Sequence, residues 1–284
     1  MNIKAHIYAI AKMTKNIIII PARYASTRLP AKPLAIIAGQ TMLARVVAIA
    51  NEAAKLAGDC KVLVATDHEM IANHCVELGV DYVLTDENCQ SGSDRCAQAV
   101  AKLSYAPEFI INLQGDAPLT PPDFIVDMIN SYWSNPADVV TLVTQLSWTE
   151  LDLMRQQKIK TPFSGTIVAL RKSDGQALWF SKQIIPAIRG EEELRAQSSA
   201  MISPVWRHIG IYGYSAVMLA RYSTMAESNY EKLEGLEQLR LLENDCKIRC
   251  VAVDYGNRAA MSGVDSPQDV LIAEALIAKH GELL

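Results

Sequence analysis

The chain has 284 residues, of which half are hydrophobic and a fifth are charged. A chain of this length buries a sizeable core without disulfides or a structural metal, which excludes small stapled scaffolds. The formal net charge of −4 gives no support to general nucleic-acid binding. The charges are unevenly placed, since seven Lys and Arg residues and no acidic residue precede Glu52. We therefore expect the N-terminal part to bind an anion.

The first half of the chain alternates predicted strands and helices. Residues 16–20 form a β-branched run ended by Pro21, which is typical of a strand buried on both faces of a parallel sheet. The same alternation predicts strands at 62–65, 82–84, 109–113 and 139–143, and helices at 41–57, 68–78, 93–103 and 122–133. The pattern indicates an α/β fold with a doubly wound, mostly parallel, Rossmann-like sheet.

After about residue 145 the pattern changes to hairpin-like strands, a polar loop, one further strand and two helices. The hairpin-like strands lie at 166–170 and 177–180, and the polar loop at 187–204. The further strand lies at 208–214, and the two helices at 233–244 and 266–282. We interpret residues 16–284 as a single catalytic domain with an embedded β-rich subregion at about 160–215. Residues 1–15 are interpreted as a dispensable extension, and we hypothesise that translation begins at Met13.

Cysteine usage and hydropathy indicate the cellular compartment of the protein. Six cysteines form no C-x-x-C motif, which is typical of reduced thiols in a cytoplasmic protein. We interpret Cys246 and Cys250 as core residues, with metal binding as the alternative. No apolar run approaches the roughly 18 residues of a membrane span, and the N-terminus is a poor signal peptide. We expect no membrane partner.

In an open α/β sheet, ligands bind at the carboxyl ends of the strands. The loop at 21–34 follows the first predicted strand and carries Arg23, Arg28 and Lys32 among small residues and prolines. Guanidinium groups make bidentate contacts with phosphate, so the loop is a candidate polyphosphate site. It is not a Walker loop. The alternative is that these cations are solvated surface residues.

Two aspartates are candidate ligands of a divalent cation. Asp116 follows the fourth buried strand, beside Gly115, where a carboxylate is well placed for a hard cation. Its alternative role is a hydrogen bond to its own turn. Asp265 precedes a predicted helix that Ser266 would cap and Pro267 would begin, and capping is the alternative there.

Taken together, these loops form an ordered set of motifs across residues 16–280. They are Ile19-Ile20-Pro21-Ala22-Arg23-Tyr24, Arg28-Leu29-Pro30, Lys32-Pro33-Leu34, Ala65-Thr66-Asp67, Ser91-Gly92-Ser93-Asp94-Arg95, Asn112-Leu113-Gln114-Gly115-Asp116, His208-Ile209-Gly210-Ile211-Tyr212, Leu236-Glu237-Gln238-Leu239-Arg240 and Gly263-Val264-Asp265. In this order they resemble the 3-deoxy-manno-octulosonate (Kdo) cytidylyltransferases. Sialic-acid cytidylyltransferases share the early Pro-Ala-Arg loop, but its continuation resembles the Kdo branch.

The resemblance implies transfer of a cytidylyl group from CTP to a 2-keto-3-deoxy sugar acid, with Mg²⁺ as cofactor. The products would be a CMP-sugar for lipopolysaccharide synthesis and pyrophosphate. The anomeric hydroxyl of the sugar would attack the α-phosphate while Mg²⁺ and cations stabilise the developing charge. The resemblance also implies a cytoplasmic homodimer that forms through the β-rich subregion.

Site residues carry over by position. Catalysis falls to Arg23, Lys32 and Asp116, and the metal to Asp116 and Asp265. The nucleotide would contact Ala22, Arg23, Lys32, Thr66, Ser91, Gly92 and Arg95. The sugar acid would contact Arg95, Gln114, Lys182, His208, Tyr212, Glu237 and Gln238. The alternatives are a satisfied core histidine at 208, strand packing at 212 and a surface helix pair of Glu237 with Arg240.

Four positions depart from the family pattern. Ala117 stands where Glu is usual, Ser93 where Thr is usual, Ala25 where Gly is usual and Lys182 where Arg is usual. An ammonium does not replace a guanidinium fork conservatively. We expect the reaction to be retained and the sugar to be Kdo or, if the specificity is altered, its 8-amino analogue. The alternatives are a nucleotidyltransferase for a sialic acid or a hexose 1-phosphate, and an inactive nucleotide-binding domain.

Overall fold

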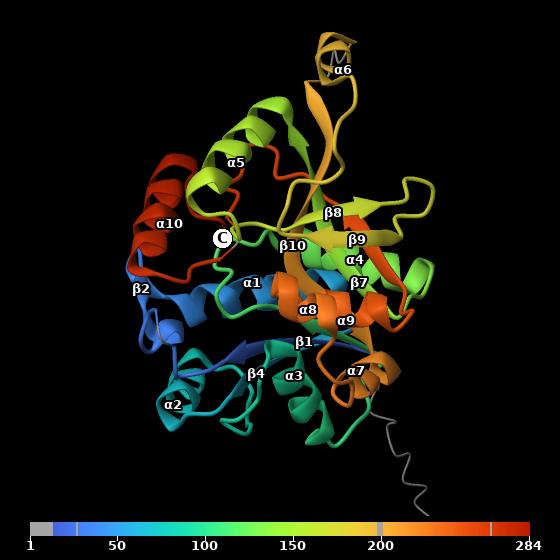
Figure 1. Cartoon of the computed structure of the whole chain (residues 1–284). Helices are drawn as coiled ribbons and strands as arrows, with labels where there is room; N and C mark the ends of the chain where they lie inside the picture. The colour runs from blue at the N-terminus through green and yellow to red at the C-terminus, as the bar shows by residue number, and fades with distance from the viewer. Residues whose placement is uncertain (1–13, 27, 198–200, 262) are drawn as a thin grey trace, which may run out of the picture.

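The computed structural model describes residues 14–26, 28–197, 201–261 and 263–284. Most of the predicted extension, including the proposed start at Met13, lies outside these residues. The sheet of the described part follows the order β11-β7-β10-β6-β1-β4-β5, and β8 and β9 extend it beside β10 (Figure 1). Its strands are β1 Asn16–Ala22, β4 Cys60–Thr66, β5 Tyr82–Leu84, β6 Phe109–Asn112, β7 Val139–Ser147, β8 Ile167–Leu170, β9 Ala177–Ser181, β10 Ile202–Ser215 and β11 Ile248–Ala252.

Most strand pairs at the centre are parallel. β1 pairs in parallel with β4 and β6, and β4 pairs in parallel with β5. β10 lies antiparallel between β6 and β7, and β11 returns parallel to β7. The predicted α/β sheet is therefore confirmed as mostly parallel.

Helices cover both faces of the sheet because successive side chains of β1 point to opposite sides. Ile18 and Ile20 belong to one core cluster, and Ile17 and Ile19 to the other. The first cluster lies under α1 Met42–Ala57, α2 Glu69–Leu78 and α4 Pro122–Ser134. The second lies under α3 Gly92–Ala101, α7 Ala216–Tyr222 and α9 Glu237–Glu243.

The remaining elements cover the edge of the site. The short η1 Lys32–Leu34 precedes the hairpin of β2 Ile36–Ile37 and β3 Gln40–Thr41. α10 Pro267–His280 packs near this hairpin, since Ile37, Met42, Val264 and Ala273 share a small core. Ser266 caps α10 and Pro267 begins it, as predicted.

The second half of the chain departs from the prediction in three places. The stretch 187–204, predicted as a loop, contains α6 Glu191–Gln197 and the start of β10. The predicted helix at 233–244 is two helices, α8 Asn229–Glu234 and α9, because Gly235 takes the left-handed conformation at φ 64° and ends α8. α5 Trp148–Lys160 lies between the predicted strands at 139–143 and 166–170, where the sequence pattern predicts no named element.

Candidate active site

Loops that follow parallel strands converge on one cavity of about 230 Å³. The loop after β1 contributes Arg23 and Lys32, and the loop after β6 contributes Gln114 and Asp116. The cavity is lined by ten of the predicted site residues, namely Ala22, Arg23, Lys32, Ser91, Gly92, Arg95, Gln114, Asp116, Glu237 and Asp265. The fold therefore brings these ten residues, which are distant in the sequence, to one cavity.

Lys32 lies between the two predicted metal ligands. Its ammonium is 2.6 Å from Oδ2 of Asp116 and 3.0 Å from Oδ1 of Asp265. Burial lowers the pKa of Lys32, but the two carboxylates outweigh burial and raise it overall. Burial raises the pKa of Asp265, and the contact with Lys32 outweighs this and lowers it. Lys32 and Asp265 therefore stabilise each other as ions.

The backbone fixes the distance between these carboxylates. The amide of Val264 donates to the carbonyl of Asp116 at 2.8 Å, which ties the loop before α10 to the loop after β6. Gly115 is required beside them because a Cβ there would lie 2.6 Å from the carbonyl oxygen of Pro21. The close approach of two loops, rather than either loop alone, places Asp265 beside Asp116.

The donor set fits Mg²⁺ that arrives with a polyphosphate. The described residues contain no group of three or more His, Cys, Asp or Glu side chains suited to a metal. Mg²⁺ binds through one or two carboxylates, with waters and substrate phosphates completing its coordination. Asp116 and Asp265 meet that requirement, and their spacing around Lys32 shows that the position accommodates a cation.

The remaining cations of the loop differ in availability. Arg23 is exposed at the cavity, and within the described part of the chain its guanidinium has no hydrogen-bond or ion-pair partner. Arg28 reaches Asp265 at 3.1 Å, but its side chain is 68% exposed, so the pair contributes little to stability. Arg23 and Lys32, unlike Arg28, thus line the cavity.

Arg95 is engaged differently from the prediction. Its guanidinium donates to Oδ2 of Asp67 at 2.8 Å and to the hydroxyl of Thr85 at 2.6 Å, and its side chain is 3% exposed. Arg95 lines the cavity, but its guanidinium forms its ion pair with Asp67 of the protein itself. Asp67 belongs to the Ala65-Thr66-Asp67 motif and directly follows the predicted second strand. This strand-end position is the sequence feature that points to Asp67 as a residue near the site. Thr66 itself is fully buried.

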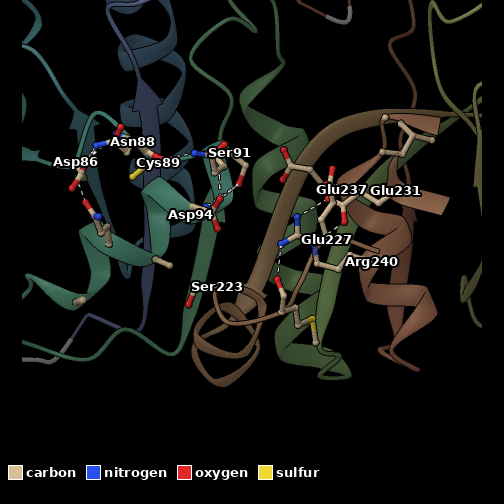
Figure 2. A pocket seen from close by; sticks show the side chains of 17 residues that line it. Asp86, Asn88, Cys89, Ser91, Asp94, Ser223, Glu227, Glu231, Glu237 and Arg240 are labelled. Atoms are coloured by element: carbon tan, nitrogen blue, oxygen red, sulfur yellow. Dashed lines mark hydrogen bonds and ion pairs between the residues drawn. The ribbon is translucent and has the colours of Figure 1, made fainter. Parts of the chain in front are cut away.

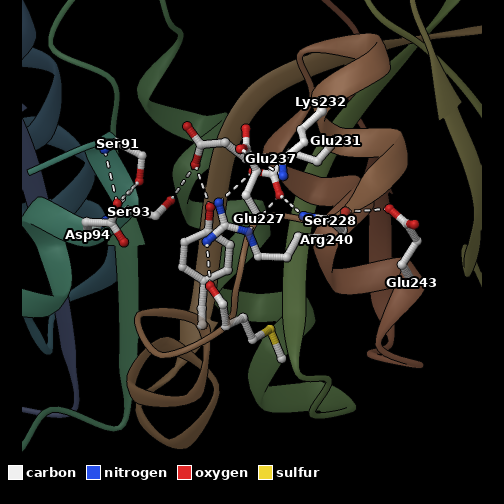
Figure 3. A network of polar contacts seen from close by, with 12 residues as sticks. Ser91, Ser93, Asp94, Glu227, Ser228, Glu231, Lys232, Glu237, Arg240 and Glu243 are labelled. Atoms are coloured by element: carbon white, nitrogen blue, oxygen red, sulfur yellow. Dashed lines mark hydrogen bonds and ion pairs between the residues drawn. The ribbon is translucent and has the colours of Figure 1, made fainter.

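A polar network links the cavity to α9 (Figure 3). The hydroxyl of Ser93 lies 3.1 Å from Oε2 of Glu237 and 3.2 Å from the side-chain amide of Asn112. Asn112 in turn accepts from Gln114 at 3.1 Å. Burial raises the pKa of Glu237 despite these hydrogen bonds. Ser93, one of the departures from the family pattern, is therefore the centre of the network.

A larger cavity of about 900 Å³ adjoins the first and shares Ser91 and Glu237 with it. Figure 2 shows its lining between α3 on one side and α8 and α9 on the other. Carboxylates dominate this lining, at Asp86, Asp94, Glu227, Glu231 and Glu237, with one guanidinium at Arg240. Glu231 already pairs with Arg240 at 2.6 Å. The larger cavity is strongly acidic.

Four predicted sugar residues lie together outside both cavities. Tyr212 donates to Oε1 of Gln238 at 2.9 Å, and its ring lies 5.4 Å from that of His208. Lys182 bonds to the hydroxyl of Thr166 at 3.2 Å. Burial lowers the pKa of His208 to about 3, so the ring is neutral. Nε2 of Gln238 is buried without a hydrogen-bond partner among the described residues.

Comparisons with known proteins identify the class of this site. A cytidylyltransferase family model matches residues 17–248. A 3-deoxy-manno-octulosonate cytidylyltransferase of Maricaulis maris is 40% identical over 94% of this chain and 98% of its own length. One from Vibrio parahaemolyticus is 36% identical over 92% of this chain and 98% of its own length.

A solved structure agrees with these relatives. It is a CMP:2-keto-3-deoxy-manno-octonic acid synthetase complexed with CTP, 32% identical, with a TM-score of 0.79 over 93% of this chain and 99% of its own. The fold and the site thus define a nucleotidyltransferase. The chain belongs to the 3-deoxy-manno-octulosonate cytidylyltransferase family. No helix within the described ranges is long and apolar enough to cross a membrane.

Proposed function

We propose that the protein transfers the cytidylyl group of CTP to a Kdo-type sugar acid, with release of pyrophosphate. The observation that carries this proposal is the pair of carboxylates held around Lys32, beside a guanidinium at Arg23 that has no partner within the described ranges. Cations and a metal-competent pair of carboxylates at strand ends suit a polyphosphate substrate.

The proposed role of each residue follows from the charge of its side chain. Arg23 and Lys32 hold the triphosphate, and Asp116 and Asp265 would hold Mg²⁺, which would offset the charge that develops on the phosphates. Ser91 and Gly92 lie at the N-terminus of α3, which favours a negative group. Gln114 lines the smaller cavity and Glu237 lines both cavities, and there the anomeric hydroxyl would approach the α-phosphate. Positioning and electrostatics supply the catalysis.

The sugar-acid residues Lys182, His208, Tyr212 and Gln238 are proposed to contact the sugar. The orphan amide of Gln238 supports this role, because a buried donor without a partner is suited to an incoming oxygen. The acidic lining of the larger cavity supports a sugar that carries an amine, such as the 8-amino analogue of Kdo. We also propose a homodimer and, from its six free thiols, a cytoplasmic location.

Pyrophosphate release is the test of this function. We expect release with CTP and Mg²⁺ and either Kdo or 8-amino-Kdo, with faster turnover of the amino sugar. Equal rates with both sugars would contradict the altered specificity. Preference for UTP or GTP would remove the cytidylyl assignment, and CTP binding without turnover of any sugar acid would indicate an inactive nucleotide-binding domain.

A further inference from the structure

We propose that Asp67 is a positioning residue that couples the triphosphate loop after β1 to α3, and that Arg95 acts through Asp67 instead of binding the sugar acid. This inference rests on the proposed function for the identity of the nucleotide. Asp67 directly follows β4, which pairs with β1 in the sheet. Its side chain is 8% exposed.

The two carboxylate oxygens of Asp67 serve different elements. Oδ1 accepts from the backbone amide of Tyr24 at 2.9 Å, one residue after Arg23. Oδ2 accepts from the guanidinium of Arg95 at 2.8 Å, on the first turns of α3. One buried carboxylate therefore fixes the residue beside the unpaired cation and the helix that presents Ser91 and Gly92 to the same cavity.

Two further contacts hold this junction. The ring of Tyr24 stacks on His68, with centroids 3.9 Å apart and planes at 14°. Thr85 accepts from Arg95 and donates to the carbonyl of Thr66 at 3.1 Å. Arg95 is thus engaged on both of its terminal nitrogens and has no exposed charge to offer a sugar carboxylate. Such a clamp fixes the orientation of Arg23, on which catalysis by positioning depends.

A double-mutant cycle on CTP affinity separates this role from a sugar contact. Asp67→Asn and Arg95→Gln should each weaken CTP binding by roughly tenfold in calorimetry. The double variant should be no weaker than either single variant, because both act through one pair. In the pyrophosphate assay the KM for CTP should rise while the KM for the sugar acid stays near its wild-type value.

Glu282→Gln is the matched control, because it removes the carboxylate partner of the buried Arg45, away from the cavity. It should lower thermal stability and leave CTP affinity unchanged. Wild-type CTP affinity in the folded Asp67→Asn variant, or an Arg95→Gln effect confined to the KM of the sugar acid, would overturn the proposal. Should Asp67→Asn not fold, Asp67→Glu keeps the charge and shifts the Tyr24 contact, and unchanged CTP affinity in that variant overturns the proposal equally.

If the wild-type protein binds CTP but releases no pyrophosphate with any sugar acid, the proposed function fails while the calorimetric cycle still decides the role of Asp67. If the wild-type protein does not bind CTP, both proposals fail together.

Discussion

At the scale of single residues, the site depends on charges that are stable only in each other's presence. Lys32 neutralises two carboxylates, and they in turn keep it charged in a half-buried position. Removing one member of such a cluster leaves the others imperfectly compensated, whereas adding a metal and a triphosphate supplies new partners. The cluster is therefore suited to exchange its internal contacts for a ligand.

Asp116→Asn tests the metal role directly. The amide keeps the shape of the side chain but loses the charge that holds Mg²⁺, so we expect turnover to fall by about a hundredfold or more with folding nearly unchanged. Pyrophosphate release across a magnesium titration measures this. Asp245→Asn, in a turn at φ 59° that Asn tolerates, is the control and should keep full activity. Near-normal activity of Asp116→Asn would remove Asp116 from the metal site.

His208 predicts a specific dependence of stability on pH. Its folded pKa of about 3 lies below the unfolded value of about 6.5, so the unfolded chain binds the extra proton between these values. Stability attributable to the neutral ring is therefore present above pH 6.5 and is lost as pH falls toward 3. From pH 7 to pH 5 the wild type should lose about 2 kcal/mol more unfolding free energy than His208→Gln.

Urea denaturation at the two pH values gives this difference. The exposed His280→Gln change is the matched control, since it removes a histidine from the C-terminal turn of α10. Equal pH slopes for the wild type and His208→Gln would show that folding leaves the pKa of His208 unchanged.

At the scale of elements, the antiparallel β10 joins the two halves of the sheet. Its residues 212–215 pair with β6, and most of its length pairs with β7. This strand carries His208 and Tyr212, and its close contact with β6 depends on Gly213, where a Cβ would lie 2.1 Å from the ring of Phe109. The positions of His208 and Tyr212 therefore depend on how closely β10 packs beside β6.

Gly213→Ala is expected to destabilise this junction. The added methyl must displace the buried ring of Phe109, so the unfolding free energy should fall by about 1–3 kcal/mol. Gly210→Ala on the same strand is the control, because a Cβ there meets nothing within 4 Å. Chemical denaturation of both variants measures the difference, and equal stabilities would mean that Phe109 moves aside at no cost.

At the scale of the whole molecule, the β-rich subregion leaves large apolar side chains exposed. Phe163 is 65% exposed and Leu178 is 53% exposed, and both lie within the predicted 160–215 segment. Apolar surface of this kind is typical of an interface. We therefore propose that the homodimer forms through this 160–215 segment.

Light scattering should give twice the 31.2 kDa mass of the chain. Leu178→Glu should shift the mass toward the monomer, because a charge buried in an apolar interface lacks a partner. Leu56→Glu is the control at a similarly exposed position, 57%, on α1. A monomeric wild type would refute the dimer.

The order of elements through about residue 143 follows from the sequence, because strand and helix periods are local signals. Residues at strand ends also predicted which loops would meet at the cavity, which is likewise a local signal. In the second half the structure departs from the prediction where the local signals are weaker. The apolar residues of α5 lack a helical period, and Gly235 divides a predicted helix into two. Only the tertiary structure decided that Lys32 bridges Asp116 and Asp265 and that Arg95 pairs with Asp67. These contacts join residues 28 to 233 positions apart, and their distances depend on how the sheet brings the loops together, which no local pattern records.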